Sequence, residues 1–134
     1  MLAPALDTVR LSLHVLAATV WVGGQIVMTG LVGASRELGG DAPKMLALAF
    51  ARMAWPAYVV LLATGIWNVT AVHYSSQGSA WKAVLMAKIA VVLLAGIAVS
   101  LHQRATGKAQ LALWGSVGGL ASVAALVMGI LLAG

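Results

Sequence analysis

The sequence predicts an all-α integral membrane protein, a four-helix bundle with up-down-up-down topology. Hydrophobic types make up 62% of the 134 residues and charged types 8%, whereas soluble globular domains have about 45–50% and 25%. A small soluble protein has a large surface for its volume and must cover it with polar groups. The chain also contains four apolar stretches joined by short polar connections. We therefore expect a single transmembrane domain over residues 1–134.

A helix needs roughly 20 residues to cross the hydrocarbon core, and each apolar stretch is close to that length. The stretches are Leu11–Val32, Met53–Val72, Ala83–Leu101 and Leu111–Ala133. With their flanks they predict helices at about residues 8–33, 43–73, 80–103 and 109–133. They lack the alternation of barrel strands, which leaves helices as the spanning structure. Because the connections are short, sequential helices should run antiparallel.

The net charge of +5 comes from Lys and Arg residues scattered between the apolar stretches, without a basic run. This pattern favours contact with the lipid bilayer and does not favour nucleic-acid binding. The basic residues concentrate around the first and third connections, at Arg36, Lys44, Arg104 and Lys108, whereas Arg10 lies on the opposite side. The positive-inside rule therefore predicts that both termini and the middle connection face outward. The chain has no Cys, which excludes disulfides, thiolate metal sites and iron–sulfur clusters.

His14 is the first candidate functional residue, because it lies within the first apolar stretch, in LSLHVLAATVWVGG. Trp21 and Met28 follow at intervals of seven, so a regular helix would place the three on one face. His14 is either a core histidine that is hydrogen-bonded to a neighbour, or a ligand for a cofactor or metal. A titratable side chain within a membrane is functional by default, so we favour the ligand role.

Lys88 is the second candidate, and it shares a heptad face with Trp81, Ala95 and His102. A lysine within a membrane helix costs roughly 2.5–3.5 kcal/mol on insertion scales. It either extends toward the outer interface or meets an anion. The three acids of the chain, Asp7, Glu37 and Asp41, all lie outside the apolar stretches. An anion from outside the protein, for example a cofactor carboxylate, would therefore explain Lys88.

Further polar groups lie near the outward end of the second helix. Thr64 and Asn68 are one turn apart beside Trp67, and His73 closes the helix before Tyr74. Thr and Asn often form hydrogen bonds between membrane helices. Glycines in the first helix (Gly23, Gly24, Gly30 and Gly33) and in the last (Gly115, Gly118 and Gly119) allow close approach, either within the bundle or in a homodimer. No hydrolytic triad, carboxylate pair or phosphate loop is present, so catalysis by protein acid–base groups alone is not expected.

Three segments carry a resemblance: LHVLAATVWVGG, ATGIWN and LMAKIAVVLL. They resemble the membrane domain of the copper resistance protein D family. They are also similar to the distantly related membrane protoporphyrinogen oxidase of many bacteria, a small helical bundle that binds haem b. The likeness implies functional roles for His14 and Lys88, iron ligation by His14, and location in a bacterial inner membrane. The chain departs from the oxidase pattern because it lacks a histidine close after the third-helix lysine, unless His102 takes that place at a longer spacing.

Three interpretations remain open, and we rank haem first. In the haem b interpretation His14 and His73 bind iron, while Lys88 binds a propionate or takes the sixth position. The side chains expected around the cofactor are Trp21, Trp67, Asn68 and Tyr74. The protein would then have a redox role in electron transfer, gas or oxidant chemistry, or porphyrinogen oxidation, and whether it is an oxidoreductase stays open. In the copper interpretation His14 acts with Met28, Met53 or Met86, because thioethers suit Cu(I). The third interpretation is a cofactor-free partner subunit.

Overall fold

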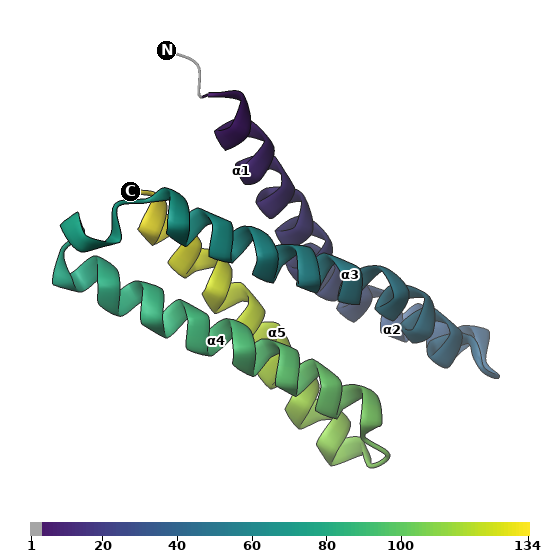
Figure 1. Ribbon diagram of the computed structural model, residues 1–134. Helices are drawn as coiled ribbons and strands as arrows, with labels where there is room; N and C mark the ends of the chain where they lie inside the picture. The colour runs from purple at the N-terminus through teal and green to yellow at the C-terminus, as the bar shows by residue number, and fades with distance from the viewer. Residues whose placement is uncertain (1–3) are drawn as a thin grey trace. The chain divides into compact units, whose positions relative to one another are not determined.

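The computed structural model describes residues 4–134, and every element of secondary structure in that range is helical (Figure 1). The first helical stretch consists of α1 (Ala5–Ala18), a π-helical turn η1 (Thr19–Gly23) and α2 (Gly24–Leu38). It is followed by α3 (Ala42–Ala71), the short 3₁₀ helix η2 (Tyr74–Ser76), α4 (Ser79–Arg104) and α5 (Lys108–Ala133). The predicted all-α class is confirmed.

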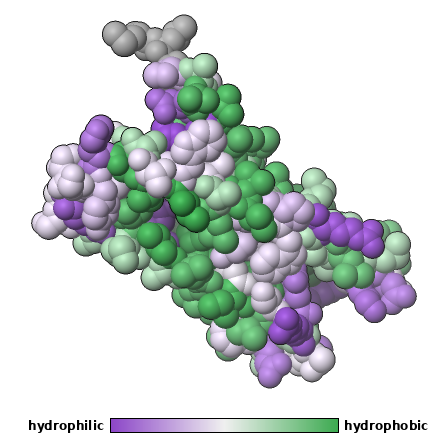
Figure 2. Space-filling view, in the orientation of Figure 1, coloured by the Kyte–Doolittle hydropathy of each residue, from purple (hydrophilic) through white to green (hydrophobic). Residues whose placement is uncertain are grey.

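Four helical stretches are long and apolar enough to cross a membrane, with 34, 30, 26 and 26 residues. Large apolar side chains lie exposed along all of them, for example Leu16, Ile66, Ile97 and Leu120. Figure 2 shows hydrophobic residues along the helices and the most hydrophilic ones mainly toward helix ends. This distribution suits a chain surrounded by lipid, and the protein is a multi-pass membrane protein.

The first helical stretch continues beyond its apolar part. It ends at Leu38, whereas the sequence predicted an end near residue 33. Only Gly39, Gly40 and Asp41 therefore connect it to α3. Both glycines have positive φ, 74° and 56°, a conformation that costs other residue types more. The chain therefore reverses within three residues, and α3 starts with Pro43 in its first turn, where its missing N–H is not needed.

The chain forms two compact units, each a helical hairpin. The N-terminal unit ends at Val72, and within it α3 packs against α1, η1 and α2. The C-terminal unit begins at His73, and within it α4 packs along α5. Short connections make the helices antiparallel in both hairpins, as predicted.

The π-helical turn η1 is the feature of the N-terminal unit that departs from a regular helix. A π turn accommodates an additional residue, so the side chains after it are rotated relative to those before it. Trp21 lies inside this turn and is only 3% exposed, whereas Met28 comes after it. The heptad spacing of His14, Trp21 and Met28 therefore does not describe one straight face.

Candidate functional site

His14 lies on the side of α1 that meets α3. Its Nδ1 is 2.8 Å from the hydroxyl oxygen of Thr64, a residue that is 5% exposed. A Cβ placed on Gly65 would lie 3.8 Å from Cε1 of the imidazole, so the ring lies along the α3 backbone at a glycine. The imidazole is thus held by a hydrogen bond to one residue and by contact with the next.

Thr64 fixes the orientation of the His14 ring. Its hydroxyl is 2.8 Å from His14 Nδ1 and 2.7 Å from the carbonyl oxygen of Val60, so the imidazole is tied to the α3 backbone through Thr64. A histidine with one ring nitrogen held by a hydrogen bond is typical of metal ligands, which bind through the other nitrogen.

An aromatic cluster follows His14 along the same interface between helices. Trp21 packs on Tyr58 with ring centroids 4.5 Å apart, and Trp55 lies 5.5 Å from Trp21 and 5.7 Å from Tyr58. Trp21 and Tyr58 are both buried. The cluster provides a rigid apolar floor about two helical turns from His14.

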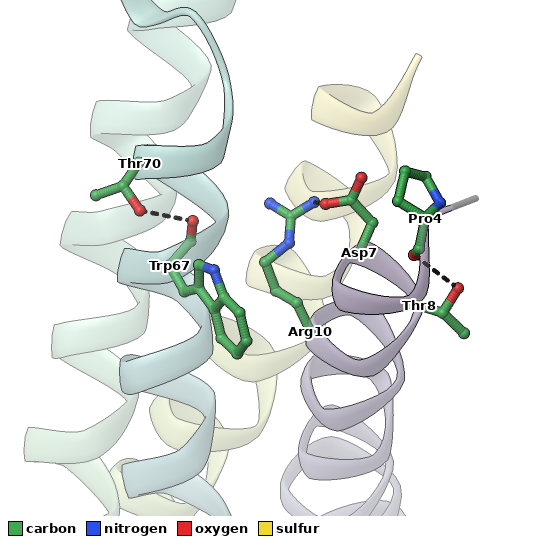
Figure 3. A network of polar contacts seen from close by, with 6 residues as sticks. All are labelled: Pro4, Asp7, Thr8, Arg10, Trp67 and Thr70. Carbon is green, nitrogen blue, oxygen red and sulfur yellow. Dashed lines mark hydrogen bonds and ion pairs between the residues drawn. The ribbon is translucent and has the colours of Figure 1, made fainter.

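A buried arginine lies one turn of α1 before His14. Arg10 is 8% exposed, and its Nη2 donates to Asp7 Oδ1 at 2.9 Å. Figure 3 shows its side chain directed from α1 toward the side of α3 that carries Trp67. The pairing with Asp7 neutralises a charge that the positive-inside count had placed at the outer interface.

Two polar atoms in this region have no hydrogen-bond partner among residues 4–134, although both are buried. They are Nε of Arg10 and Oδ1 of Asn68. Because α1 and α3 run antiparallel and His14 meets Thr64, the residues one turn away on each helix, Arg10 and Asn68, lie at the same level. A donor on α1 and an acceptor on α3 are therefore left unsatisfied at the same level of the hairpin, which is rare in native proteins.

Lys88 belongs to the C-terminal unit, where it faces α5. Its Nζ is 3.0 Å from the position that a Cβ on Gly129 would take, so the ammonium lies against bare backbone. It forms no hydrogen bond or ion pair with any residue from 4 to 134. Gly129 lies in the last two turns of α5, whose carbonyl end is favourable for a cation. This contact gives a physical reason for a lysine at this depth.

The remaining predicted residues of the C-terminal unit lie in the segment before α4. The backbone of His73 precedes η2, and its carbonyl oxygen accepts from the Ser76 hydroxyl at 2.7 Å. Tyr74 lies 6.4 Å from the ring of Trp81, and the ammonium of Lys82 is 5.1 Å from the Tyr74 ring centroid. His73 and Tyr74 are both exposed. These contacts anchor the segment to the start of α4.

In the part of the chain from residue 4 onward, no three His, Cys, Asp or Glu side chains gather as a metal cluster would. Met53 and Met86 are 65% and 58% exposed. An ion held by protein groups alone would therefore draw on His14 with few other donors. A cofactor that brings most of its own ligands fits this donor set better, because it requires one or two axial side chains.

The sequence interpretation did not include four residues that the structure places beside the candidates. Trp55 and Tyr58 carried a signal, because aromatic residues at i and i+3 share a helix face. Arg10 was assigned to the interface by its charge, and Gly129 had no signal at all. A scan of protein-family models, a search of curated proteins and a search of solved structures find no match to this chain.

Proposed function

We propose that the protein is a small membrane protein that binds haem b and has a redox role, with His14 as an axial ligand of the iron. The observation that carries the proposal is the 2.8 Å hydrogen bond between His14 Nδ1 and the Thr64 hydroxyl, which orients an imidazole within the membrane span. A haem is flat and apolar and fits between helices when an imidazole can reach its iron.

The position of His14 in the membrane span also supports the proposal. His14 is nine residues from the start of α1 at Ala5, or about 14 Å along the helix. At this depth an imidazole needs polar partners, and a ligand role explains why the side chain is there. The aromatic cluster of Trp21, Trp55 and Tyr58 makes the interface between helices two turns from His14 apolar, as the surroundings of a porphyrin need to be.

The bound haem would supply one-electron chemistry at iron, and the protein would hold and orient it in an apolar environment. Its redox role would be electron transfer, gas or oxidant chemistry, or porphyrinogen oxidation. His73 and Lys88 as further ligands, and the side chains of Trp67, Asn68 and Tyr74 around the cofactor, stay predictions from the sequence. So do a bacterial inner membrane location with both termini outside, and a homodimer through glycine-rich faces.

The copper interpretation has less support from the contacts. Thioethers bind Cu(I) well, but Met53 and Met86 are largely exposed. A cofactor-free partner subunit would not need an imidazole held in a fixed orientation within the membrane span. We therefore retain haem as the proposed cofactor.

The absorption spectrum of the purified protein tests the proposal. The full chain, expressed in haem-replete cells and purified in detergent, should show a Soret band, and a pyridine haemochrome assay should identify haem b. His14→Ala should abolish the band. Thr64→Val should weaken haem binding about 10–100-fold, because it removes the group that orients the ligand.

His102→Ala is the matched control, since it removes an imidazole that bonds the Leu111 carbonyl at 2.8 Å at the far end of α4. This variant should keep the Soret band. The proposal is wrong if the wild-type protein stays colourless after haemin is added, or if His14→Ala and wild type have the same spectrum. One copper per chain without a Soret band would favour the copper interpretation instead.

A further inference from the structure

We infer that Arg10 and Asn68 form a binding site for a hydroxyl of a neutral lipophilic molecule of the hydroquinone class. The site lies within the N-terminal unit, one turn from His14 toward the start of α1. Its binding does not depend on the proposed haem. Two unsatisfied atoms, the charge balance and the surroundings carry the inference.

The unsatisfied atoms define what the ligand must offer. Arg10 is more than nine-tenths buried, and its Nε–H donates to no residue from 4 to 134. Oδ1 of Asn68, at the same level of α3, accepts from none of these residues. A single hydroxyl satisfies both atoms, because its oxygen can accept from Nε–H while its hydrogen is donated to Oδ1. Burying either atom without a hydrogen-bond partner costs free energy, so a ligand that supplies both partners is strongly favoured.

The charge balance requires a neutral ligand. The Arg10 guanidinium is already paired with Asp7 at 2.9 Å, so the pair carries no net charge. An anion added here would leave an uncompensated charge at a buried site, which is unfavourable. A carboxylate or phosphate could also accept from Nε–H, but it has no hydrogen to donate to Asn68 Oδ1. A neutral hydroxyl meets both conditions.

The surroundings favour a ligand with an aromatic ring that enters from the bilayer. Leu6, Val9 and Leu13 are exposed on the turns of α1 around Arg10, so lipid surrounds this end of the helix. The indole of Trp67 is 40% exposed and extends beside Arg10 (Figure 3). It is a partly free aromatic face next to the two polar atoms, and aromatic rings prefer to pack on such faces.

The test uses the full chain in nanodiscs and three ligands, two of which share a decyl tail. A decyl-hydroquinone should bind saturably, as followed by quenching of tryptophan fluorescence. Its dimethyl ether keeps the ring and the tail but has no hydroxyl hydrogen, and it should bind about tenfold more weakly. A diacylglycerol, which has a hydroxyl without a ring, should compete poorly.

Two variants test the assignment of residues. Arg10→Lys keeps the charge opposite Asp7 but lacks the Nε–H, and Asn68→Leu removes the acceptor. Both should lose the preference for the hydroquinone over its ether. Thr70→Val is the control, because the Thr70 hydroxyl bonds only the Trp67 carbonyl of its own helix, at 2.9 Å. It should keep the preference. Circular dichroism and size-exclusion chromatography establish whether each variant is folded. If one variant does not fold, the other still tests the assignment.

The inference is overturned if hydroquinone and ether bind equally, or if both folded variants keep the preference. It is also overturned if no saturable binding occurs, which would mean that the two atoms share only water. Equal competition by diacylglycerol would assign the site to a lipid hydroxyl instead. None of these outcomes would affect the Soret band that tests the haem proposal, so the two can fail separately.

Discussion

The two units hold their antiparallel helices together in different ways. In the C-terminal unit, large side chains of α4 lie against the backbone of α5. Trp81 donates to the Leu132 carbonyl at 3.1 Å, and Lys88 lies on Gly129. In the N-terminal unit, polar and aromatic side chains of both helices also meet each other, as His14 and Thr64 do, in addition to glycine contacts such as Gly24 with Phe50.

The comparison extends to the heptad patterns. In α4 the residues Trp81, Lys88 and His102 all contact α5, because this helix is regular along its whole length, and Ala95 of the same heptad series is buried. In the first helix the π turn interrupts the equivalent pattern. In the C-terminal unit, small residues on α5 thus allow the straight helix α4 to pack closely. In the N-terminal unit, bulky polar and aromatic pairs pack around the widened π turn. This difference predicts which substitutions each unit tolerates.

Among the substitutions at Gly118, Thr64 and Gly129, the largest effect on stability should come from filling the glycine contact at Gly118 in the C-terminal unit. A Cβ on Gly118 would lie 3.1 Å from Val99 Cγ2 and 3.6 Å from the Val99 backbone nitrogen, which cannot move away easily. Gly118→Val should therefore lower the free energy of unfolding by about 2 to 3 kcal/mol. Unfolding in mixed micelles with increasing denaturing detergent measures the change.

Gly119→Val is the control for this prediction, because nothing lies within 4 Å of a Cβ at Gly119. It adds the same side chain to the same helix and should change stability by less than about 0.5 kcal/mol. Equal loss in both variants would mean that the close contact of α4 with α5 at Gly118 is not what limits substitution.

A smaller loss should follow from breaking the polar pair of the N-terminal unit. Thr64→Val keeps the shape of the side chain but removes the hydroxyl that lies 2.8 Å from His14 Nδ1. We expect a loss of about 1 to 2 kcal/mol, since a hydrogen bond between membrane helices is lost. The same unfolding measurement applies, with Thr70→Val as the control for removing a hydroxyl near the end of α3. If both variants unfold alike, the bond between His14 and Thr64 does not stabilise the hairpin.

Much of the fold could be predicted from the sequence, because hydrophobic length alone specifies a membrane helix. The predicted start of the second helix near Pro43 differs by one residue from its observed start at Ala42. The extension of the first helix to Leu38 could not be predicted from hydropathy, since Ser35, Arg36 and Glu37 are polar. The π turn had no signal either, because Thr19–Gly23 is as apolar as its neighbours.

The candidate site was predictable in residue type but not in pairing. His14, Thr64 and Asn68 stood out because polar groups are costly in lipid. That Thr64 meets His14 depends on the register of α1 against α3, which a single sequence does not encode visibly. Arg10 was taken for an interface charge, because the positive-inside rule counts charges and does not consider local pairs such as the one with Asp7.

The smallest effect should come from Gly129→Ala, although this glycine, like Gly118, packs under a side chain of α4. A Cβ on Gly129 would lie 3.0 Å from Nζ of Lys88 and 3.7 Å from Cε, both at the end of a flexible side chain. The lysine can move aside by changing rotamers, and alanine favours the helix over glycine by up to about 1 kcal/mol. Stability should therefore stay within about 0.5 kcal/mol of wild type.

The ammonium, however, should be displaced, and spectroscopy can follow it. With ¹⁵N-labelled lysine, the Nζ resonance of Lys88, assigned by its loss in Lys88→Met, should shift in Gly129→Ala. The resonances of Lys44, Lys82 and Lys108 should not shift, and Gly119→Ala should leave all of them in place. A large loss of stability without a shift would mean that Lys88 is fixed against α5 as rigidly as Val99. The flexibility of the contacting side chain would then not explain why Gly118 and Gly129 differ in their tolerance of a larger residue.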